Sequence, residues 1–292
     1  MNILSLFDGM SCGQLALERA NIKIDKYYAS EIEQPSIKVT QTNYPNTIQL
    51  GSVLDVKGNE LPNIDLLIGG SPCQGFSLAG KQLNFDDPRS KLFFEYVRLL
   101  KECNPKYFLL ENVKMKQEYQ DIITQYLRVE PIEINSNLVS AQNRRRLYWT
   151  NIPNVQQPID KGILLSDILE TPYEYYKIRA TVQKNAEYSD NKSVTLTSAM
   201  GMGGGNVPML INQEFYEKHK NKYIDGIDRK GLRLLTPIEC ERLQTLPDNY
   251  TSTACKTQRY KMLGNGWTVD VITHIFSFIN GFEKTTERGQ KN

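Results

Sequence analysis

Short apolar strands alternate with amphipathic helices through the first half of the chain, and this rhythm constrains the fold more than any other feature. Strands are predicted over residues 2–6, 26–30, 64–70, 107–112, 132–137 and 145–152, and helices over 13–20, 35–43, 91–103 and 117–128. Parallel strands need such helical crossovers. The sequence therefore predicts an α/β fold with a doubly wound, mostly parallel sheet.

The rhythm ends near Ile152, and the chain to about Cys255 is polar, rich in turns and irregular. One clear helix signal begins at Thr236, where Pro237 suits the first helical position and Glu239 completes a capping box. Helical periodicity returns from about residue 269 to 278. We therefore predict a large domain over 1–155, a small irregular domain over 156–255, and a segment over 256–292 that returns to the first domain.

No apolar run reaches the roughly 18 residues of a membrane span, and Asp8 and Glu18 interrupt the one candidate signal peptide. We expect a cytosolic protein. The five cysteines include no CxxC pair, so the sequence favours reduced thiols over a disulfide framework and predicts no metal site.

The formal net charge of +2 does not by itself indicate a nucleic-acid partner, because a near-neutral total can hide a basic face. Arg144, Arg145 and Arg146 are consecutive, and residues 218–233 carry six basic side chains against two acidic ones. A solvated surface and a nucleic-acid contact both fit this pattern.

The first strand ends in SLFDGMSCG, a glycine turn at the carboxyl edge where open α/β sheets bind ligands. Gly9 and Gly13 do not form GxGxxG, so a nucleotide-like ligand without a pyrophosphate fits better than a dinucleotide, although such a turn can also serve packing alone. Glu31 ends the second strand roughly 20 residues later, where a carboxylate can accept hydrogen bonds from a ribose. Together these features suggest an adenosine-containing cofactor.

Cys73 follows the third long strand in GGSPCQGFS, where Pro72 stiffens the approach to the thiol. A thiolate held at this edge is a strong nucleophile. Glu111 ends the next strand; alone it could merely terminate that strand, but beside Cys73 it can carry a proton. Such a pair suits addition to an electron-poor ring. Cys12 and Cys103 are interpreted as packing residues.

Eight segments occur in the order of one known family: SLFDGMSCG, the strand-ending Glu31, GSVLDV, GGSPCQGFS, LLENV, QNRRR, TPIECERLQTLP and LGNGWTV. With them the chain resembles the cytosine-C5 DNA methyltransferases; several stretches resemble the animal de novo class, whereas the length is similar to bacterial and phage members. The resemblance implies a Rossmann-like class I fold that binds S-adenosyl-L-methionine, with target recognition in 156–255. It also implies DNA (cytosine-5-)-methyltransferase activity on double-stranded DNA.

By this resemblance, the catalytic residues are Cys73, Glu111, Arg144 and Arg146. Cys73 would attack carbon 6 of a cytosine that has left the duplex, because the stack covers that atom. Glu111 would protonate N3, and carbon 5 would then take the methyl group. Arg144 and Arg146 would organise the catalytic loop and contact the base, with Arg145 facing away.

The resemblance also assigns the cofactor site. Its residues would be Phe7, Asp8, Gly9, Met10, Gly13, Glu31, Ile32, Ser52, Val53, Pro72, Leu92, Asn265 and Gly266. Ser52 stands where many members carry an acidic residue that reads the adenine amine, so we expect somewhat weaker cofactor binding. Asp65 is a less favoured substitute, because it precedes its strand.

The DNA-binding residues would be Gln74, Ser77, Gln142, Thr195, Leu196, Gly203, Gly204 and Gly205, although packing suits Thr195 and Leu196 better. The basic segment 218–233 lies in the part that the family uses for reading DNA, where it would contact phosphates. We expect the loop 74–89 to close over DNA when the base flips. The small recognition domain suggests a target of about four to six base pairs.

Two other functions stay open. One branch of the family methylates tRNA, but its Cys-Phe-Thr signature is missing from this sequence. A catalytically silent DNA-binding regulator would carry a damaged Cys, Glu or Arg motif, and none is damaged. We expect a monomer in the cytoplasm of a bacterial or phage-infected cell, with a cognate restriction endonuclease as a further candidate partner.

Overall fold

A computed structural model of the chain describes residues 1–71, 88–170, 176–179, 188–189, 191–200, 207–212 and 232–289. The chain divides into two compact units. The first contains Met1–Ile134, Arg145–Gln157 and Val271–Asn292, and the second contains Asn135–Arg144 and Pro158–Asp270. Within the described ranges, no helix is long and apolar enough to cross a membrane, and no cluster of three or more His, Cys, Asp or Glu side chains could hold a metal.

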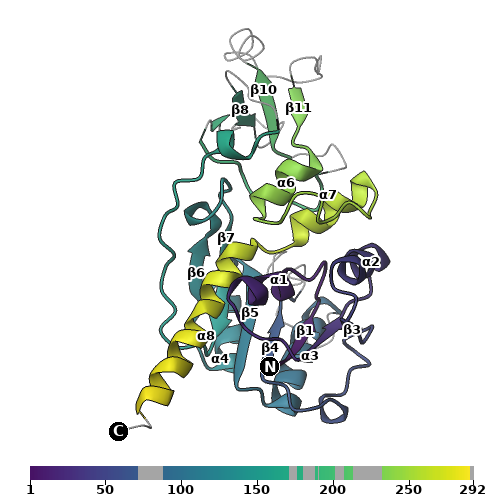
Figure 1. Ribbon diagram of the computed structural model, residues 1–292, viewed down its shortest axis with the longest axis vertical. Coiled ribbons are helices and arrows are strands. Elements are labelled where there is room, and N and C mark those ends of the chain that lie inside the picture. Colours follow the sequence, from purple (N-terminus) through teal and green to yellow (C-terminus); the bar gives the residue numbers. More distant parts are fainter. Residues whose placement is uncertain are drawn as a thin grey trace. The chain divides into compact units, whose positions relative to one another are not determined.

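A seven-stranded sheet forms the centre of the first unit (Figure 1). Its strands are β1 (Asn2–Leu6), β2 (Lys26–Ser30), β3 (Ile48–Gln49), β4 (Leu66–Gly69), β5 (Tyr107–Val113), β6 (Ile132–Asn135) and β7 (Arg145–Thr150), in the order β3-β2-β1-β4-β5-β7-β6. The pairs from β3 to β5 are parallel, and β7 is antiparallel to β5. Strand order reverses between β1 and β4, which is where doubly wound sheets bind ligands.

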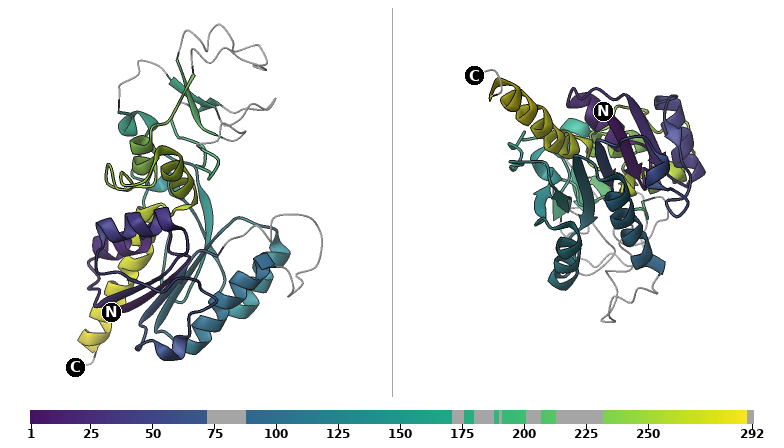
Figure 2. Two further views of the ribbon diagram at one scale, coloured as in Figure 1. Left: turned by 90° about the vertical axis from the view of Figure 1, so that its right-hand side faces the viewer. Right: turned by 90° about the horizontal axis from the view of Figure 1, so that it is seen from below.

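Helices cover both faces of this sheet (Figure 2). On one face, α3 (Pro88–Cys103) and α4 (Gln117–Leu127) pack Phe93 and Ile123 against Leu4, Leu67 and Trp149 of the strands. On the other face lie α1 (Cys12–Arg19) and α8 (Val269–Gly289). Between β2 and β3 the chain forms α2 (Gln34–Asn43), and the short 3-10 helix η1 (Gly58–Glu60) precedes β4. Burial on both faces explains why the strands read as continuous apolar runs.

The second unit contains an antiparallel sheet in the order β11-β10-β8-β9. Its elements are η2 (Ser136–Leu138), η3 (Leu165–Ile168), β8 (Tyr176–Arg179), β9 (Tyr188–Ser189), β10 (Met209–Asn212), β11 (Leu232–Leu234), α6 (Pro237–Leu243) and α7 (Lys256–Asn265). The predicted capping box of α6 is confirmed: Thr236 Oγ1 accepts from Glu239 N at 3.1 Å, and Glu239 Oε2 accepts from Thr236 N at 2.8 Å.

The doubly wound α/β prediction is confirmed, and each element predicted in the first half is present: β1 and β2 have the predicted ends, and the others differ by up to three residues at an end. β3 and α7 are among the elements that were not predicted. β3 has only two residues, and α7 is polar along most of its length, so neither carries a strong local pattern. Compact units are not functional domains, so the assignment of target recognition to residues 156–255 stays a prediction.

Candidate active site

The glycine turn after β1 is held in an unusual backbone conformation. Phe7, Gly9 and Ser11 all have positive φ, at 56°, 61° and 59°. Left-handed backbone costs free energy for residues other than glycine, so surrounding contacts must impose it at Phe7 and Ser11. Glu31, at the end of β2, supplies one such contact, because its Oε2 accepts from Gly9 N at 2.7 Å. The predicted ribose-binding carboxylate and the predicted glycine turn therefore lie together.

The other oxygen of Glu31 organises the start of the next segment. Glu31 Oε1 accepts from the backbone N–H groups of Ile32 at 2.7 Å and Glu33 at 2.8 Å. These bonds fix the carboxylate at the carboxyl edge of β2, and Ile32 directly after it is 67% exposed. A fixed acceptor beside an exposed apolar side chain suits a ribose joined to an aromatic base.

Asp8 lies inside the turn and is surrounded by hydroxyl groups. Its Oδ1 accepts from the Tyr27 hydroxyl at 2.8 Å, and its Oδ2 accepts from the Ser11 hydroxyl. Burial raises the pKa of the Asp8 carboxyl to about 6, although the hydroxyl donors of Ser11, Ser5 and Tyr27 oppose the shift. Asp8 thus fastens the turn to β2 through Tyr27, a contact that the sequence pattern did not reveal.

The remaining predicted cofactor residues of the first unit divide into buried and accessible ones. Met10, Gly13 and Val53 are buried, so they support the walls of a site. Leu92 on α3 is partly buried against the core. Ser52 Oγ accepts from Leu54 N at 3.2 Å, and Leu54 is 49% exposed. Asp65 lies at the amino ends of the strands, where its Oδ2 accepts from Asn2 N at 2.7 Å.

Glu111 and Arg146 form an ion pair at the carboxyl end of β5. Arg146 Nε lies 2.9 Å from Glu111 Oε1, and the two side chains are 13% and 11% exposed. The antiparallel pairing of β7 with β5 creates this contact, since it places Glu111 opposite Tyr148 and Val113 opposite Arg146. Screening is weak at this depth, so the guanidinium orients the carboxylate firmly. Arg145 instead turns outward, 64% exposed, toward Glu133.

Arg144 and Gln142 belong to the second unit and are almost completely buried there. The Arg144 guanidinium donates to the carbonyl oxygens of Leu196 at 3.0 Å, Gly264 at 3.3 Å and Gly266 at 2.9 Å. Gln142 accepts from Leu196 N at 2.7 Å and donates to Leu243 O at 3.2 Å. Both side chains therefore join distant segments. The guanidinium of Arg144 has five N–H donors for buried carbonyl oxygens, and the amide of Gln142 can both donate and accept.

Two of the predicted DNA contacts are placed in the interior. Gln142 and Leu196 are both 0% exposed, so their side chains do not reach a surface in this structure. Thr195 is partly exposed and donates to Asn143 O at 2.6 Å. Asn265 is exposed at the end of α7, and Gly266 caps that helix. The other predicted site residues, Pro72, Cys73, Gln74, Ser77, Gly203, Gly204 and Gly205, lie outside the described residues, as do the loop 74–87 and most of the basic segment.

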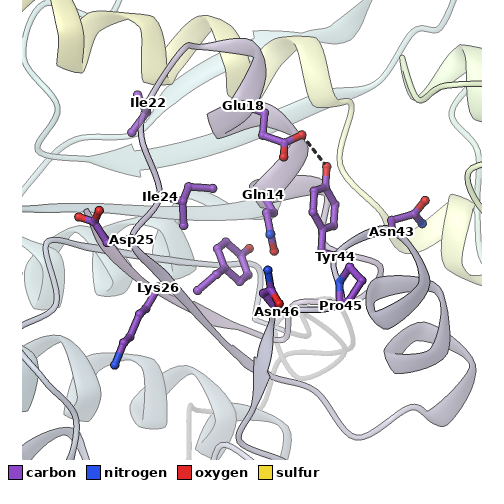
Figure 3. A pocket seen from close by; sticks show the side chains of 11 residues that line it. Gln14, Glu18, Ile22, Ile24, Asp25, Lys26, Asn43, Tyr44, Pro45 and Asn46 are labelled. Atoms are coloured by element: carbon purple, nitrogen blue, oxygen red, sulfur yellow. Dashed lines mark hydrogen bonds between the residues drawn. The ribbon is translucent and has the colours of Figure 1, made fainter.

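A separate pocket of about 470 Å³ lies in the first unit (Figure 3). Gln14 and Glu18 of α1, Lys26 at the start of β2, and Tyr44 after α2 line it. The Tyr44 hydroxyl donates to Glu18 Oε2 at 3.0 Å. This pocket adjoins the amino end of β2, opposite the strand ends that carry Glu31, so it is distinct from the candidate site.

Comparison with known proteins identifies relatives over nearly the whole chain. The sequence model of C-5 cytosine-specific DNA methylases matches residues 1–194 and 115–280. The chain is 30% identical over 301 residues to the Type II methyltransferase M1.ScrFI of Lactococcus lactis subsp. cremoris, covering 94% of this chain and 76% of that one. It is 29% identical over 300 residues to M.NlaX of Neisseria lactamica, covering 94% of both.

Solved structures agree on the fold. The S. pombe Dnmt2 methyltransferase has a TM-score of 0.73 at 19% identity, covering 95% of this chain and 97% of that one. The Entamoeba histolytica methyltransferase EhMeth has a TM-score of 0.71 at 18% identity, with the same coverage.

Proposed function

Because the chain belongs to the C-5 cytosine-specific DNA methylase family, we propose that it methylates carbon 5 of a flipped-out cytosine in duplex DNA through a covalent bond to Cys73. S-adenosylmethionine supplies the methyl group as an electrophile. The observation that carries the proposal is the buried Glu111–Arg146 pair. Glu111 lies on β5, next to β4, the strand that precedes Cys73 in the sequence.

The chain's own residues account for the remaining chemistry. The Cys73 thiolate adds to carbon 6 of the cytosine while the Glu111 carboxyl gives a proton to N3, which makes carbon 5 nucleophilic. Arg146 holds Glu111 in position through the 2.9 Å ion pair. After methyl transfer, a base removes the proton from carbon 5 and the Cys73 thiolate leaves.

The residues of the first unit fit the cofactor. Glu31 is tied to the glycine turn, as a ribose acceptor should be, and Ile32 and Leu54 expose apolar surface at neighbouring strand ends. We propose that Phe7 and Gly9 of the turn and Leu92 on α3 also line this site. Asn265 and Gly266 stay proposed cofactor residues on the strength of the family resemblance alone. Arg144 would act on catalysis indirectly, through the backbone that it holds.

Transfer of labelled methyl groups from S-adenosylmethionine to mixed-sequence duplex DNA tests the proposal, and bisulfite sequencing identifies the target. Cys73→Ser should abolish transfer, and Glu111→Gln should lower kcat by about 10²- to 10⁴-fold, the usual contribution of a general acid. Cys255→Ser, at an exposed cysteine that caps α7, serves as the matched control and should keep full activity. Full transfer by Cys73→Ser would contradict the mechanism.

The relatives do not favour the alternative of tRNA methylation, because the curated ones are Type II methyltransferases. Parallel assays with tRNA and duplex DNA distinguish the two substrates. We also propose a monomer that acts in the cytoplasm of a bacterial or phage-infected cell, with a cognate restriction endonuclease as partner. Size-exclusion chromatography with light scattering tests the monomer.

A further inference from the structure

The segment that follows β3 carries Ser52 and Val53, to which the family resemblance assigns cofactor contacts. It also carries the exposed Leu54. β3 pairs with β2, the strand after which Glu31 and Ile32 follow. The segment forms a tight turn, in which Ser52 Oγ accepts from Leu54 N at 3.2 Å and Ser52 O accepts from Asp55 N at 3.0 Å. Ser30 Oγ, at the end of β2, donates to Gly51 O at 2.9 Å, so the turn adjoins the segment that contains Ile32. An adenine that packs on Ile32 would therefore meet this turn.

One arginine on α3 fastens the turn. Arg98 Nη2 donates to Val53 O at 3.2 Å and to Val56 O at 2.9 Å, so a single guanidinium holds carbonyl oxygens at both ends of residues 53–56. Its Nε donates to Glu95 Oε2 at 2.8 Å, and its Nη1 donates to Glu102 Oε1 at 2.9 Å. Two carboxylates on the same helix thus fix the guanidinium in the orientation that the turn requires.

Glu102 extends the attachment by one further contact. Its Oε2 accepts from Gly58 N at 2.7 Å. A Cβ atom added to Gly58 would lie 2.7 Å from Glu102 Cβ and 2.9 Å from Cys103 Sγ, so the backbone at this point packs directly on α3. The segment is therefore anchored to α3 from residue 53 to residue 58.

We propose, on the basis of the proposed function, that Arg98 is a positioning residue for the adenine end of the cofactor site. The chain has Ser52 where a carboxylate would read the adenine amine, so a serine hydroxyl or a backbone carbonyl must accept that hydrogen bond. A serine hydroxyl can adjust its place by only one short torsion and a backbone carbonyl by none, and a misplaced acceptor leaves the amine unpaired. Arg98 fixes the backbone of the turn and so holds the acceptor in place. In this proposal, Arg98 itself does not contact the cofactor.

The test compares S-adenosyl-L-homocysteine with its deaminated form, S-inosyl-L-homocysteine, in which a carbonyl oxygen replaces the adenine amine and N1 carries a proton. One well-placed hydrogen bond is worth about tenfold in affinity, so the wild type should bind the adenosyl ligand about tenfold more tightly. In Arg98→Ala, we expect the Kd of S-adenosyl-L-homocysteine to rise about fivefold or more. The ratio of the Kd of the inosyl ligand to the Kd of the adenosyl ligand should fall from about ten to about two. KM for DNA, and kcat at saturating S-adenosylmethionine, should stay within about twofold of the wild-type values.

Arg98→Lys is a conservative variant that keeps the charge and can reach only some of the partners, so its ratio should be intermediate. Arg242→Ala is the matched control. Arg242 is 30% exposed, against 32% for Arg98, and it likewise joins a carboxylate, Asp248, to a carbonyl oxygen, that of Ile168. Its removal should leave the ratio unchanged.

An unchanged ratio in Arg98→Ala would overturn the positioning role while leaving the proposed function intact. Failure of the wild type to bind S-adenosyl-L-homocysteine at all would overturn both. A ratio that falls equally in Arg242→Ala would show a general loss of stability and would also count against Arg98.

Discussion

At the scale of single residues, Asp8 combines a positional role with an unfavourable charge. Its carboxylate accepts from the hydroxyls of Tyr27 and Ser11, which ties the glycine turn to β2, but burial raises its pKa from 3.8 to about 6. Below pH 3.8 the folded and unfolded states both carry the proton. Between 3.8 and 6, only the folded state keeps it, so the contribution of Asp8 to stability declines as pH rises and is lost above about 6.

Asp8→Asn should remove this pH dependence. The free energy of unfolding of the wild type, relative to that of the variant, should fall by on the order of 2 kcal/mol between pH 4 and pH 7. Urea denaturation across that range measures it. Asp25→Asn is the control: the N-terminal amine lowers the pKa of Asp25 from 3.8, so Asp25 titrates below this range and the difference between wild type and this variant should stay nearly constant from pH 4 to pH 7. A constant difference between wild type and Asp8→Asn would contradict the burial of a charged Asp8.

At the scale of elements, α7 must pack closely against backbone at Gly264, and the sequence of the helix does not predict this. A Cβ atom on Gly264 would lie 2.1 Å from the carbonyl carbon of Thr197 and 2.4 Å from Ser198 N. The helix therefore approaches backbone, which cannot rotate aside as a side chain could. Arg144 strengthens the same junction, since it donates to the carbonyl oxygens of both Leu196 and Gly264.

Gly264→Ala should accordingly destabilise the second unit by about 3 kcal/mol or more, because the methyl group forces a backbone shift. Thermal unfolding followed by circular dichroism measures the loss. Gly162→Ala is the matched control: φ is +66° there and no atom lies within 4 Å of an added Cβ, so only about 1 kcal/mol of backbone strain is expected. Equal melting temperatures for the two variants would argue against the close packing of α7.

At the scale of the whole molecule, binding of DNA and binding of cofactor should respond differently to salt. Phosphate contacts release counterions, so each lysine that contacts a phosphate adds about 0.9 to the slope of log K against log salt. Alanine at Lys218, Lys220 and Lys222 together should lower that slope by about two to three and leave the Kd of S-adenosylmethionine unchanged. Fluorescence anisotropy with duplex DNA at several salt concentrations measures the slope.

Alanine at Lys23, Lys26 and Lys38, which are exposed in the first unit, removes the same charge and serves as the control. If the two triple variants lowered the slope equally, the effect would come from net charge rather than from the basic segment.

The sequence alone determined the α/β class, the order of its main elements and the strand ends where Glu31 and Glu111 lie. Each rests on a local pattern: alternating apolar runs, a glycine turn, or a motif beside a strand. No local pattern predicts the hydrogen bond of Arg98 to Val53 O or the burial of Gln142. Arg98 is 45 residues from Val53, and Gln142 is 54 residues from its partner Leu196, so each pair meets only in the folded chain. Arg144, 122 residues from Gly266, likewise becomes a structural anchor only when the fold supplies carbonyl oxygens around it. Local chemistry thus determined which residues the site requires, and long-range packing decided which of them reach a ligand and which hold the backbone in place.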